Sequence, residues 1–116
     1  MPPDAFDHPA EFGIVVRPDV IRPVLVVTGE IDFTTAPDLY DAVRRQIAQG
    51  HEHLVVDLAG VSFMDGSVLR FLVTARRQLS EVGGSLRVTG ASGLLRRLMD
   101  ATGLSLAFPE LLVSEA

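Results

Sequence analysis

Residues 53–67 of the chain, HLVVDLAGVSFMDGS, decide which fold the sequence predicts. Residues 53–58 form a mostly apolar, β-rich run that is typical of a buried strand, and Gly60 and Ser62 suggest a loop after it. From Ser67 to about residue 82, apolar side chains recur at every third or fourth position, which predicts an amphipathic helix. The residues expected on its inward face are Val68, Leu72, Ala75, Leu79 and Val82. A buried strand that leads into a helix is typical of a parallel sheet.

Two strands and a helix are predicted on the N-terminal side of this unit. Residues 13–17 (GIVVR) and 23–29 (PVLVVTG) are both β-rich, and their short separation predicts a hairpin. Residues 35–48 show helical spacing, and Thr34 or Thr35 can cap that helix. The hairpin would supply the one antiparallel pair of the sheet.

The same alternation continues on the C-terminal side. Residues 85–89 (SLRVT) predict a strand, and residues 92–103 predict a third helix. Residues 104–108 are a candidate last strand, and residues 109–116 a short helical tail. The order β-β-α-β-α-β-α-(β) predicts an α/β fold, with a mixed, mostly parallel sheet packed with helices through right-handed crossovers.

The length of 116 residues is enough for one domain with one core. Residues 1–12 hold three of the seven prolines and show no periodic pattern, so we expect a flexible N-terminal arm there. Residues 13–116 would then form a single domain.

Composition excludes several classes of function. The formal net charge is −5 and there is no basic tract, so neither nucleic acid nor an anionic membrane is an expected partner. The absence of cysteine excludes disulfides and thiolate chemistry. No apolar run approaches the roughly 18 residues of a membrane helix, and the N-terminus has no signal-peptide pattern. We therefore expect a cytoplasmic protein without direct membrane insertion, whose oligomeric state the sequence leaves open.

Acidic side chains are expected at the carboxyl ends of the strands, where ligands gather in parallel sheets. Asp32 and Asp65 lie in loops that lead into helices, where an aspartate usually acts as a cap. No histidine or nucleophile accompanies them, so capping or partner contact is favoured over acid–base catalysis. A metal site is not indicated by the spacing of the three aspartates Asp32, Asp57 and Asp65. The pair His51 and His53 could begin such a site, but no further ligands are evident. We therefore expect no catalytic residue, no metal, no cofactor and no enzymatic activity.

Gly66 and Ser67 are the most informative residues of these loops. They begin a helix, where free backbone N–H groups and the positive end of the helix dipole favour negative charge. A hydroxyl at this place can carry a phosphoryl group at low electrostatic cost. Serine is also a preferred capping residue, and that plainer interpretation is favoured by the residues alone.

Four stretches of the chain carry a resemblance to a known family. They are VVTGEIDFTTAPDL (26–39), HLVVDLAGVSFMDGS (53–67), TARRQLSEVGGSLRVTG (74–90) and LLRRLMDATGL (94–104). Their order and spacing together resemble the STAS domain, the fold of sulfate transporters and anti-sigma factor antagonists. The resemblance covers residues 13 to about 108, and it implies the same α/β fold.

In the antagonist branch of that family, the segment after the third strand reads roughly D-S-S-G-L-G. Its first serine accepts phosphate from the anti-sigma factor, a serine kinase, and the unphosphorylated antagonist binds that factor and frees the sigma factor. This chain reads D-G-S-V-L-R at residues 65–70. Gly66 stands at the phosphoacceptor position, and Val68 and Arg70 replace glycines of the contact face. The resemblance therefore implies that the usual phosphorylation switch is missing, with Ser67 as the remaining candidate for phosphorylation.

The resemblance implies a regulatory module that sequesters an anti-sigma factor of the serine-kinase type by protein–protein contact. The alternative is an accessory subunit of a lipid-transport ABC ATPase, because some stand-alone STAS proteins that resemble this one serve there. A nucleotide-binding sensor or enzyme ranks last, because the chain has no lysine and no P-loop. Phe71 is either an aromatic anchor for the partner or an ordinary packing residue. The expected partner-binding residues are Asp32, Thr34, Asp65, Gly66, Ser67, Arg70 and Phe71.

Overall fold

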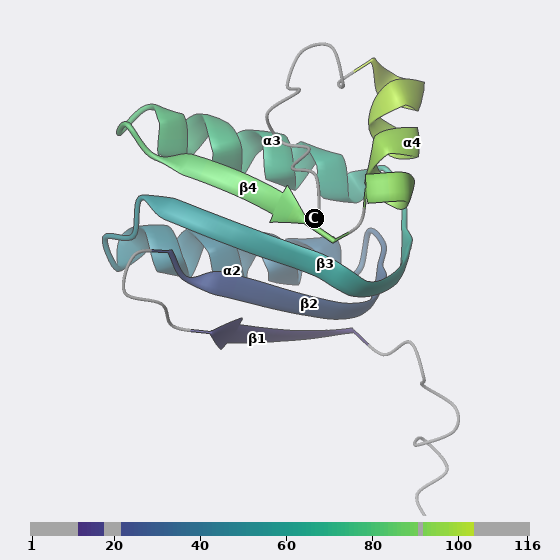
Figure 1. Ribbon diagram of the computed structural model, residues 1–116, viewed down its shortest axis with the longest axis horizontal. Helices are drawn as coiled ribbons and strands as arrows, with labels where there is room; N and C mark the ends of the chain where they lie inside the picture. Colours follow the sequence, from purple (N-terminus) through teal and green to yellow (C-terminus); the bar gives the residue numbers. More distant parts are fainter. Residues whose placement is uncertain (1–11, 18–21, 91, 104–116) are drawn as a thin grey trace, which may run out of the picture.

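The strands form one four-stranded sheet in the order β1-β2-β3-β4 (Figure 1). This is seen in a computed structural model, which describes residues 12–17, 22–90 and 92–103. The strands are β1 (Gly13–Arg17), β2 (Val24–Ile31), β3 (His53–Met64) and β4 (Ser85–Thr89). The hairpin pair β1 and β2 is antiparallel, while β2 with β3 and β3 with β4 are parallel. The predicted mixed, mostly parallel sheet is therefore confirmed.

The helices are α2 (Ala36–Ala48), α3 (Ser67–Ser80) and α4 (Ser92–Thr102). α2 and α3 lie side by side on one face of the sheet, and α4 lies at the end where β4 finishes (Figure 1). Alternate residues of the strands point toward α2 and α3, and they are fully buried there, for example Leu25, Val27, Leu54 and Val56. The described part of the chain thus buries one continuous core between the sheet and its helices.

The strand β3 is longer than the sequence predicts, and the prediction of a loop at Gly60 and Ser62 is wrong. Its pairing with β2 shifts twice, between Val26 and Thr28 and again between Gly29 and Glu30 of β2. Each shift places one extra residue in β3, as in a β-bulge. The buried positions therefore change from every second residue to every third, at Leu58, Val61 and Met64, a spacing that does not look like a strand. The added length carries β3 to the edge of the candidate site.

The helix α3 ends at Ser80, and the prediction that Val82 faces the core is wrong, because that side chain is 57% exposed. Gly84 donates its N–H to the carbonyl of Leu79 at 2.8 Å, and Gly83 donates to Ser80 at 3.1 Å. Gly83 has a φ of +81°, which glycine adopts without strain. This glycine-based helix end turns the chain toward β4 and lifts Val82 into solvent.

Several sequence-based expectations lie outside the described residues. They are the N-terminal arm up to residue 11, the candidate strand 104–108 and the helical tail 109–116. The division into an arm, residues 1–12, and one domain, residues 13–116, therefore stays a prediction. Among the described helices, none is both long and apolar enough to span a membrane.

Candidate functional site

Two loops meet at the carboxyl ends of β2 and β3, on the right-hand side of Figure 1. The first loop leads from Ile31 into α2, and the second leads from Met64 into α3. They are joined directly, because the backbone N–H of Asp65 donates to the carbonyl of Ile31 at 3.0 Å. The structure thus brings Asp32, Thr34, Asp65, Gly66 and Ser67 to one edge of the sheet, as the sequence predicts for neighbouring parallel strands.

The carboxylate of Asp32 organises the first loop. Its Oδ1 accepts hydrogen bonds from the N–H of Thr34 at 2.8 Å, the hydroxyl of Thr34 at 2.5 Å and the N–H of Thr35 at 3.2 Å. In return, the backbone N–H of Asp32 donates to Oγ1 of Thr35 at 2.9 Å. The hydroxyl of Thr34, followed by its N–H, holds the pKa of the Asp32 carboxyl below its usual value. Asp32 is therefore an ionised hydrogen-bond acceptor that holds the entrance to α2.

We expect Thr34→Val to raise the pKa of the Asp32 carboxyl toward its usual value of 3.8, because valine keeps the shape and the N–H but removes the hydroxyl. Because the pKa of Asp32 is lower in the folded state than in the unfolded state, ionised Asp32 stabilises the fold above pH 3.8. This stabilisation is lost as the pH falls through the pKa of the folded state. The stability difference between wild type and Thr34→Val should therefore be present at neutral pH and vanish in acid. Carboxyl NMR titration and chemical denaturation measure the two quantities.

The matched control is Thr74→Val, because the hydroxyl of Thr74 donates to the carbonyl of Arg70 at 2.8 Å, within α3. This variant should leave the pKa of Asp32 where it is. An unchanged pKa in Thr34→Val would show that the hydroxyl does not hold the carboxylate.

The second loop repeats the arrangement of the first. Oδ1 of Asp65 accepts the N–H of Ser67 at 2.9 Å and also accepts the hydroxyl of Ser67. Each loop thus has an aspartate whose carboxylate binds the N–H and the hydroxyl of the residue two positions later. Asp32 thus satisfies backbone donors just before α2, and Asp65 satisfies the N–H of Ser67, the first residue of α3. The N-cap residues themselves are Thr35 and Gly66, and neither makes a side-chain cap hydrogen bond.

Gly66 lies between these two residues and has ordinary helical backbone angles, with φ −66° and ψ −14°. A Cβ atom built at this position meets no atom within 4 Å. A side chain therefore fits at residue 66 without backbone strain and points into open space. The glycine is not required by the local fold.

The beginning of α3 presents some of its residues to solvent and buries others. Arg70 is exposed, one turn after Gly66, whereas Val68 is fully buried in the core and cannot touch a partner. Phe71 is half-buried and stacks on Tyr40 of α2, with ring centroids 5.0 Å apart. The hydroxyl of Tyr40 also accepts a hydrogen bond from Nε2 of Gln78 at 3.2 Å. Phe71 thus fastens α3 to α2 and leaves one part of its ring open.

Two aromatic residues near the loops were missed by the sequence-based reasoning. Phe33, between Asp32 and Thr34, is 74% exposed, and Phe63, next to the end of β3, is 47% exposed. Phe63 pairs with Glu30 in the sheet, so it lies beside the first loop. The sequence signal for Phe33 was a phenylalanine between two polar residues and outside any periodic stripe, although its exposure is visible only in the structure.

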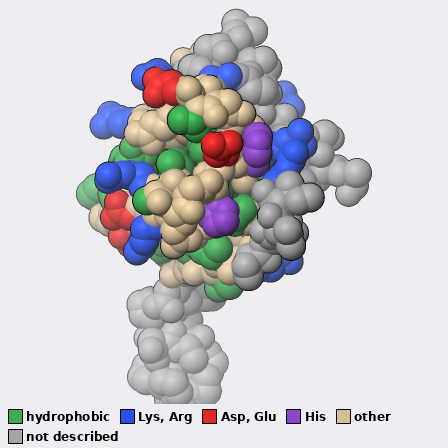
Figure 2. Space-filling view, turned by 90° about the vertical axis from the view of Figure 1, so that its left-hand side faces the viewer, with side chains coloured by type: hydrophobic (Ala, Val, Ile, Leu, Met, Phe, Trp, Pro, Cys, Tyr) green, Lys and Arg blue, Asp and Glu red, His purple; other side chains and the backbone are tan. Residues whose placement is uncertain are grey.

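The opposite end of the sheet holds the two histidines that the sequence singled out. Figure 2 views this end and shows two separate histidine side chains, with arginine and acidic side chains on the same face. Nδ1 of His53 makes a hydrogen bond with Oγ of Ser85 at 2.9 Å, which ties β3 to β4. Asp57, in the middle of β3, accepts the N–H of Ala59 at 2.9 Å. Within the described ranges, no group of three or more histidine and acidic side chains is arranged to hold a metal ion.

Comparison with known proteins gives the family. Residues 12–114 match the STAS domain. The chain belongs to the STAS domain family. Two similar proteins are named anti-sigma-B factor antagonist. The one from Listeria monocytogenes is 39% identical over 83 residues, which cover 70% of this chain and 71% of that protein. The one from Staphylococcus epidermidis is 35% identical over 78 residues, which cover 67% of this chain and 72% of that protein.

Solved structures of this STAS protein's relatives share its fold. The crystal structure of an anti-sigma factor antagonist from Mycobacterium paratuberculosis has a TM-score of 0.78 at 30% identity, covering 92% of this chain and 89% of that chain. The unphosphorylated antagonist SpoIIAA has a TM-score of 0.74 at 19% identity, covering 90% and 89%, and shows the likeness of fold alone. The predicted STAS fold is confirmed, and the named relatives are antagonists rather than enzymes.

Proposed function

We propose that this STAS protein binds and sequesters an anti-sigma factor of the serine-kinase type, and that it does so in the cytoplasm. The partner-binding surface consists of the two joined loops and the first turns of α3. Its members are Asp32, Thr34, Asp65, Gly66, Ser67, Arg70 and Phe71, and the exposed Phe33 extends it. We refer to this set of eight residues as the loop surface.

The observation that supports the proposal most is the direct joining of the two loops by the hydrogen bond from Asp65 to Ile31. It joins two segments that are far apart in the sequence into one continuous surface. Two carboxylates, one arginine and one exposed aromatic side chain lie on it, which is a composition suited to a protein partner. Relatives at 35% and 39% identity are named as antagonists of an anti-sigma factor, which supports the same kind of partner here.

The finer part of the proposal concerns regulation. The resemblance of residues 65–70 to the family's segment supports a placement of Gly66 where antagonists carry the phosphorylated serine, and glycine has no hydroxyl. The neighbouring hydroxyl of Ser67 is engaged with the carboxylate of Asp65. We propose that the protein stays in its binding-competent state and is not switched off by the partner kinase.

The function is tested by identifying what the protein binds. Tagged wild type and Asp65→Lys are used to capture proteins from a native lysate, and captured proteins are identified by mass spectrometry. An anti-sigma factor held by wild type and lost with Asp65→Lys supports the proposal. Capture of a permease and an ATPase instead would favour the alternative function as an accessory subunit of a lipid-transport complex.

We expect no turnover by the protein alone. The two carboxylates of the loop surface each accept a neighbouring hydroxyl, but they also accept backbone N–H bonds, and neither pair contains a histidine base. Incubation of purified protein with ATP or GTP should give no hydrolysis above a mock purification. Hydrolysis that is lost on changing Asp32 or Asp65 would contradict this prediction.

A further inference from the structure

The strand β1 forms one edge of the sheet, as Figure 1 shows. β2 is its partner on one side, and no strand of the described part of the chain pairs with its other side. The outward backbone N–H and C=O groups of such an edge are a template for another strand. Val15, in the centre of β1, is 64% exposed. Among the residues that the structure describes, this edge is therefore both unpaired and apolar.

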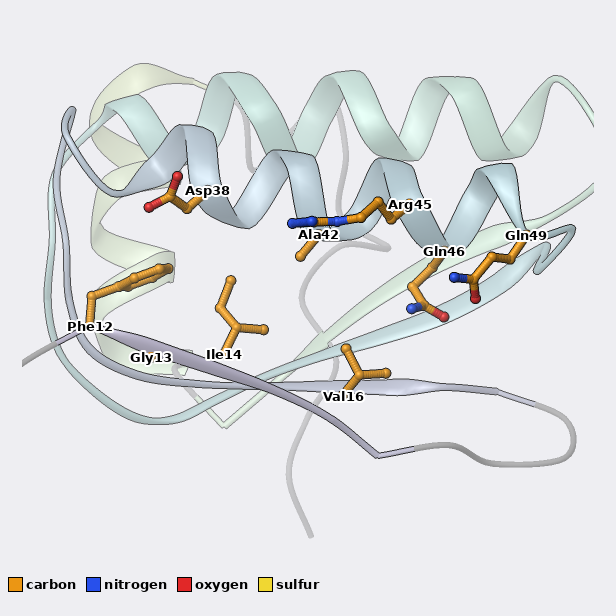
Figure 3. Close-up of a pocket in the computed structure, with 9 residues that line it drawn as sticks. All are labelled: Phe12, Gly13, Ile14, Val16, Asp38, Ala42, Arg45, Gln46 and Gln49. Atoms are coloured by element: carbon orange, nitrogen blue, oxygen red, sulfur yellow. The ribbon is translucent and has the colours of Figure 1, made fainter.

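A groove runs between this edge and α2, with a volume of about 420 Å³. Figure 3 shows Ile14 and Val16 of β1 pointing into it from one side and the small side chain of Ala42 facing them from α2. Phe12 closes the end of the groove near Asp38. The floor is therefore apolar, and the small residue at its centre lets another chain come close.

One polar side chain, that of Gln46, lies low in the groove. Gln46 is only 9% exposed, and Figure 3 shows its side chain pointing toward Val16. Its amide group has no hydrogen bond within the part of the chain that the structure describes. No buried side-chain nitrogen or oxygen of the described residues lacks a partner, so the amide atoms of Gln46 are open to the groove. The backbone of an added strand offers both a donor and an acceptor that this amide can bind.

The groove has a negative charge at one end and a positive charge at the other, and this pattern indicates which polypeptide could bind in it. Asp38 lies in the first turn of α2 and Arg45 in the last, about 10 Å apart along the helix. Both are exposed, and neither forms an ion pair with a described residue. A two-fold axis at the middle of β1 reverses the direction of a second copy. In such a pair, Asp38 of each copy would lie on the side of the partner's Arg45, so the charges of the groove would complement each other.

We propose that two copies of this chain pair through their β1 edges, antiparallel, to form a dimer with one continuous sheet. Val15 of each copy lies on the two-fold axis against the same residue of its partner, and the flanks of the two α2 helices face each other above the strands. This interface uses no residue of the loop surface, so the inference is independent of the proposed function. The two loop surfaces remain open for partners in the dimer.

Analytical ultracentrifugation of the full chain tests this pairing. We expect the wild-type protein to approach twice the monomer mass at about 1 mM and to dissociate on dilution to about 1 μM. A monomer mass over that whole range would overturn the proposal, and the groove would then have to serve a different occupant.

The strand contact is tested by Val15→Lys, which places two like charges directly opposite each other on the axis. We expect the dimer dissociation constant to rise at least about tenfold. Val82→Lys is the matched control, because Val82 is similarly exposed, at 57%, in the turn after α3. A dimer that survives Val15→Lys unchanged uses another surface, and this would overturn the proposal.

The charge pairing is tested by reversal and rescue. Asp38→Arg and Arg45→Asp should each weaken the dimer about tenfold, because each replaces two attractions with two repulsions. The double variant Asp38→Arg/Arg45→Asp restores opposite charges and should restore the dimer. It also places both charges unfavourably for the dipole of α2, so its rescue cannot come from a more stable helix. Failure of the rescue would overturn the two-fold arrangement.

Discussion

Asp65→Lys is expected to weaken binding of the anti-sigma factor more than tenfold, which corresponds to more than about 1.4 kcal/mol. Asp65 connects the two loops, because its backbone N–H donates to the carbonyl of Ile31 at the first loop and its Oδ1 accepts the N–H of Ser67 in the second. Lysine reverses the charge at the centre of the loop surface. The stability of the isolated protein should fall by only about 1 kcal/mol, the usual cost of a lost cap. Calorimetric titration and chemical denaturation separate the two effects.

Asp65→Asn distinguishes the charge from the cap. Asparagine retains an oxygen that accepts the N–H of Ser67, so the fold should keep most of its stability. If a charge pair with the partner carries the binding, Asp65→Asn should still lose part of the affinity. If Asp65→Asn binds as wild type does while Asp65→Lys does not, repulsion by the lysine is the cause.

Arg70→Glu tests the other side of the same surface. Arg70 is exposed, so its replacement should change the stability by less than about 0.5 kcal/mol and still weaken binding about tenfold. Arg77→Glu is the matched control, because Arg77 is also exposed and lies two turns further along α3. If Asp65→Lys and Arg70→Glu both bind with unchanged affinity, the partner uses a different part of the protein.

Most of this fold could be predicted because local pattern and global packing agree. The run at residues 53–58 alternates between the helix-covered face and the other face, and α3 buries one stripe against the same sheet. The pattern fails where the backbone is irregular. Two bulges change the spacing of buried residues in β3, so Gly60 and Ser62 look like a loop although the register with β2 continues to Met64. These residues are strand because they pair with β2. That strand is far away in the sequence, so a short stretch around Gly60 and Ser62 gives no sign of the pairing.

The candidate site was predictable where a residue's role is local. Asp32 and Asp65 stand before helices, and their carboxylates do bind the N–H groups that follow. The exposure of Phe33 could not be derived in this way, because it depends on how far the loop extends beyond the core. The stacking of Phe71 on Tyr40 depends on the packing of α2 against α3, so a helical wheel alone leaves its role open.

Gly66→Ser is expected to have the largest effect, because it should convert a protein that takes no phosphate into one that does. Wild type should remain unmodified when incubated with the partner kinase and ATP, since residue 66 has no hydroxyl and the hydroxyl of Ser67 is held by Asp65. The replacement should fold normally, because φ at residue 66 is −66° and the new Cβ meets no atom within 4 Å. Serine is also slightly better than glycine at the start of a helix.

The consequence for binding follows from charge. A phosphate on the new hydroxyl would lie at the N-terminus of α3, where free N–H groups tolerate it, so the fold should survive. It would add a charge of about −2 directly beside Asp65, at the centre of the loop surface. A partner that accepts the existing carboxylates would then meet an excess of negative charge. The phosphorylated Gly66→Ser protein should therefore bind at least about tenfold more weakly than its unphosphorylated form.

Mass spectrometry of wild type, Gly66→Ser and Ser67→Ala after incubation with the kinase decides where phosphate goes. Phosphate found on the Gly66→Ser variant but not on wild type supports the view that the missing hydroxyl at residue 66 is what prevents phosphorylation. Phosphate on wild type that disappears in Ser67→Ala would contradict it and make Ser67 the acceptor. The geometry weighs against that result, because the Ser67 hydroxyl lies about 100° further round the helix than that of residue 66 and must leave Asp65 to react. A kinase that places its reacting atoms within about an ångström would not reach both positions equally well.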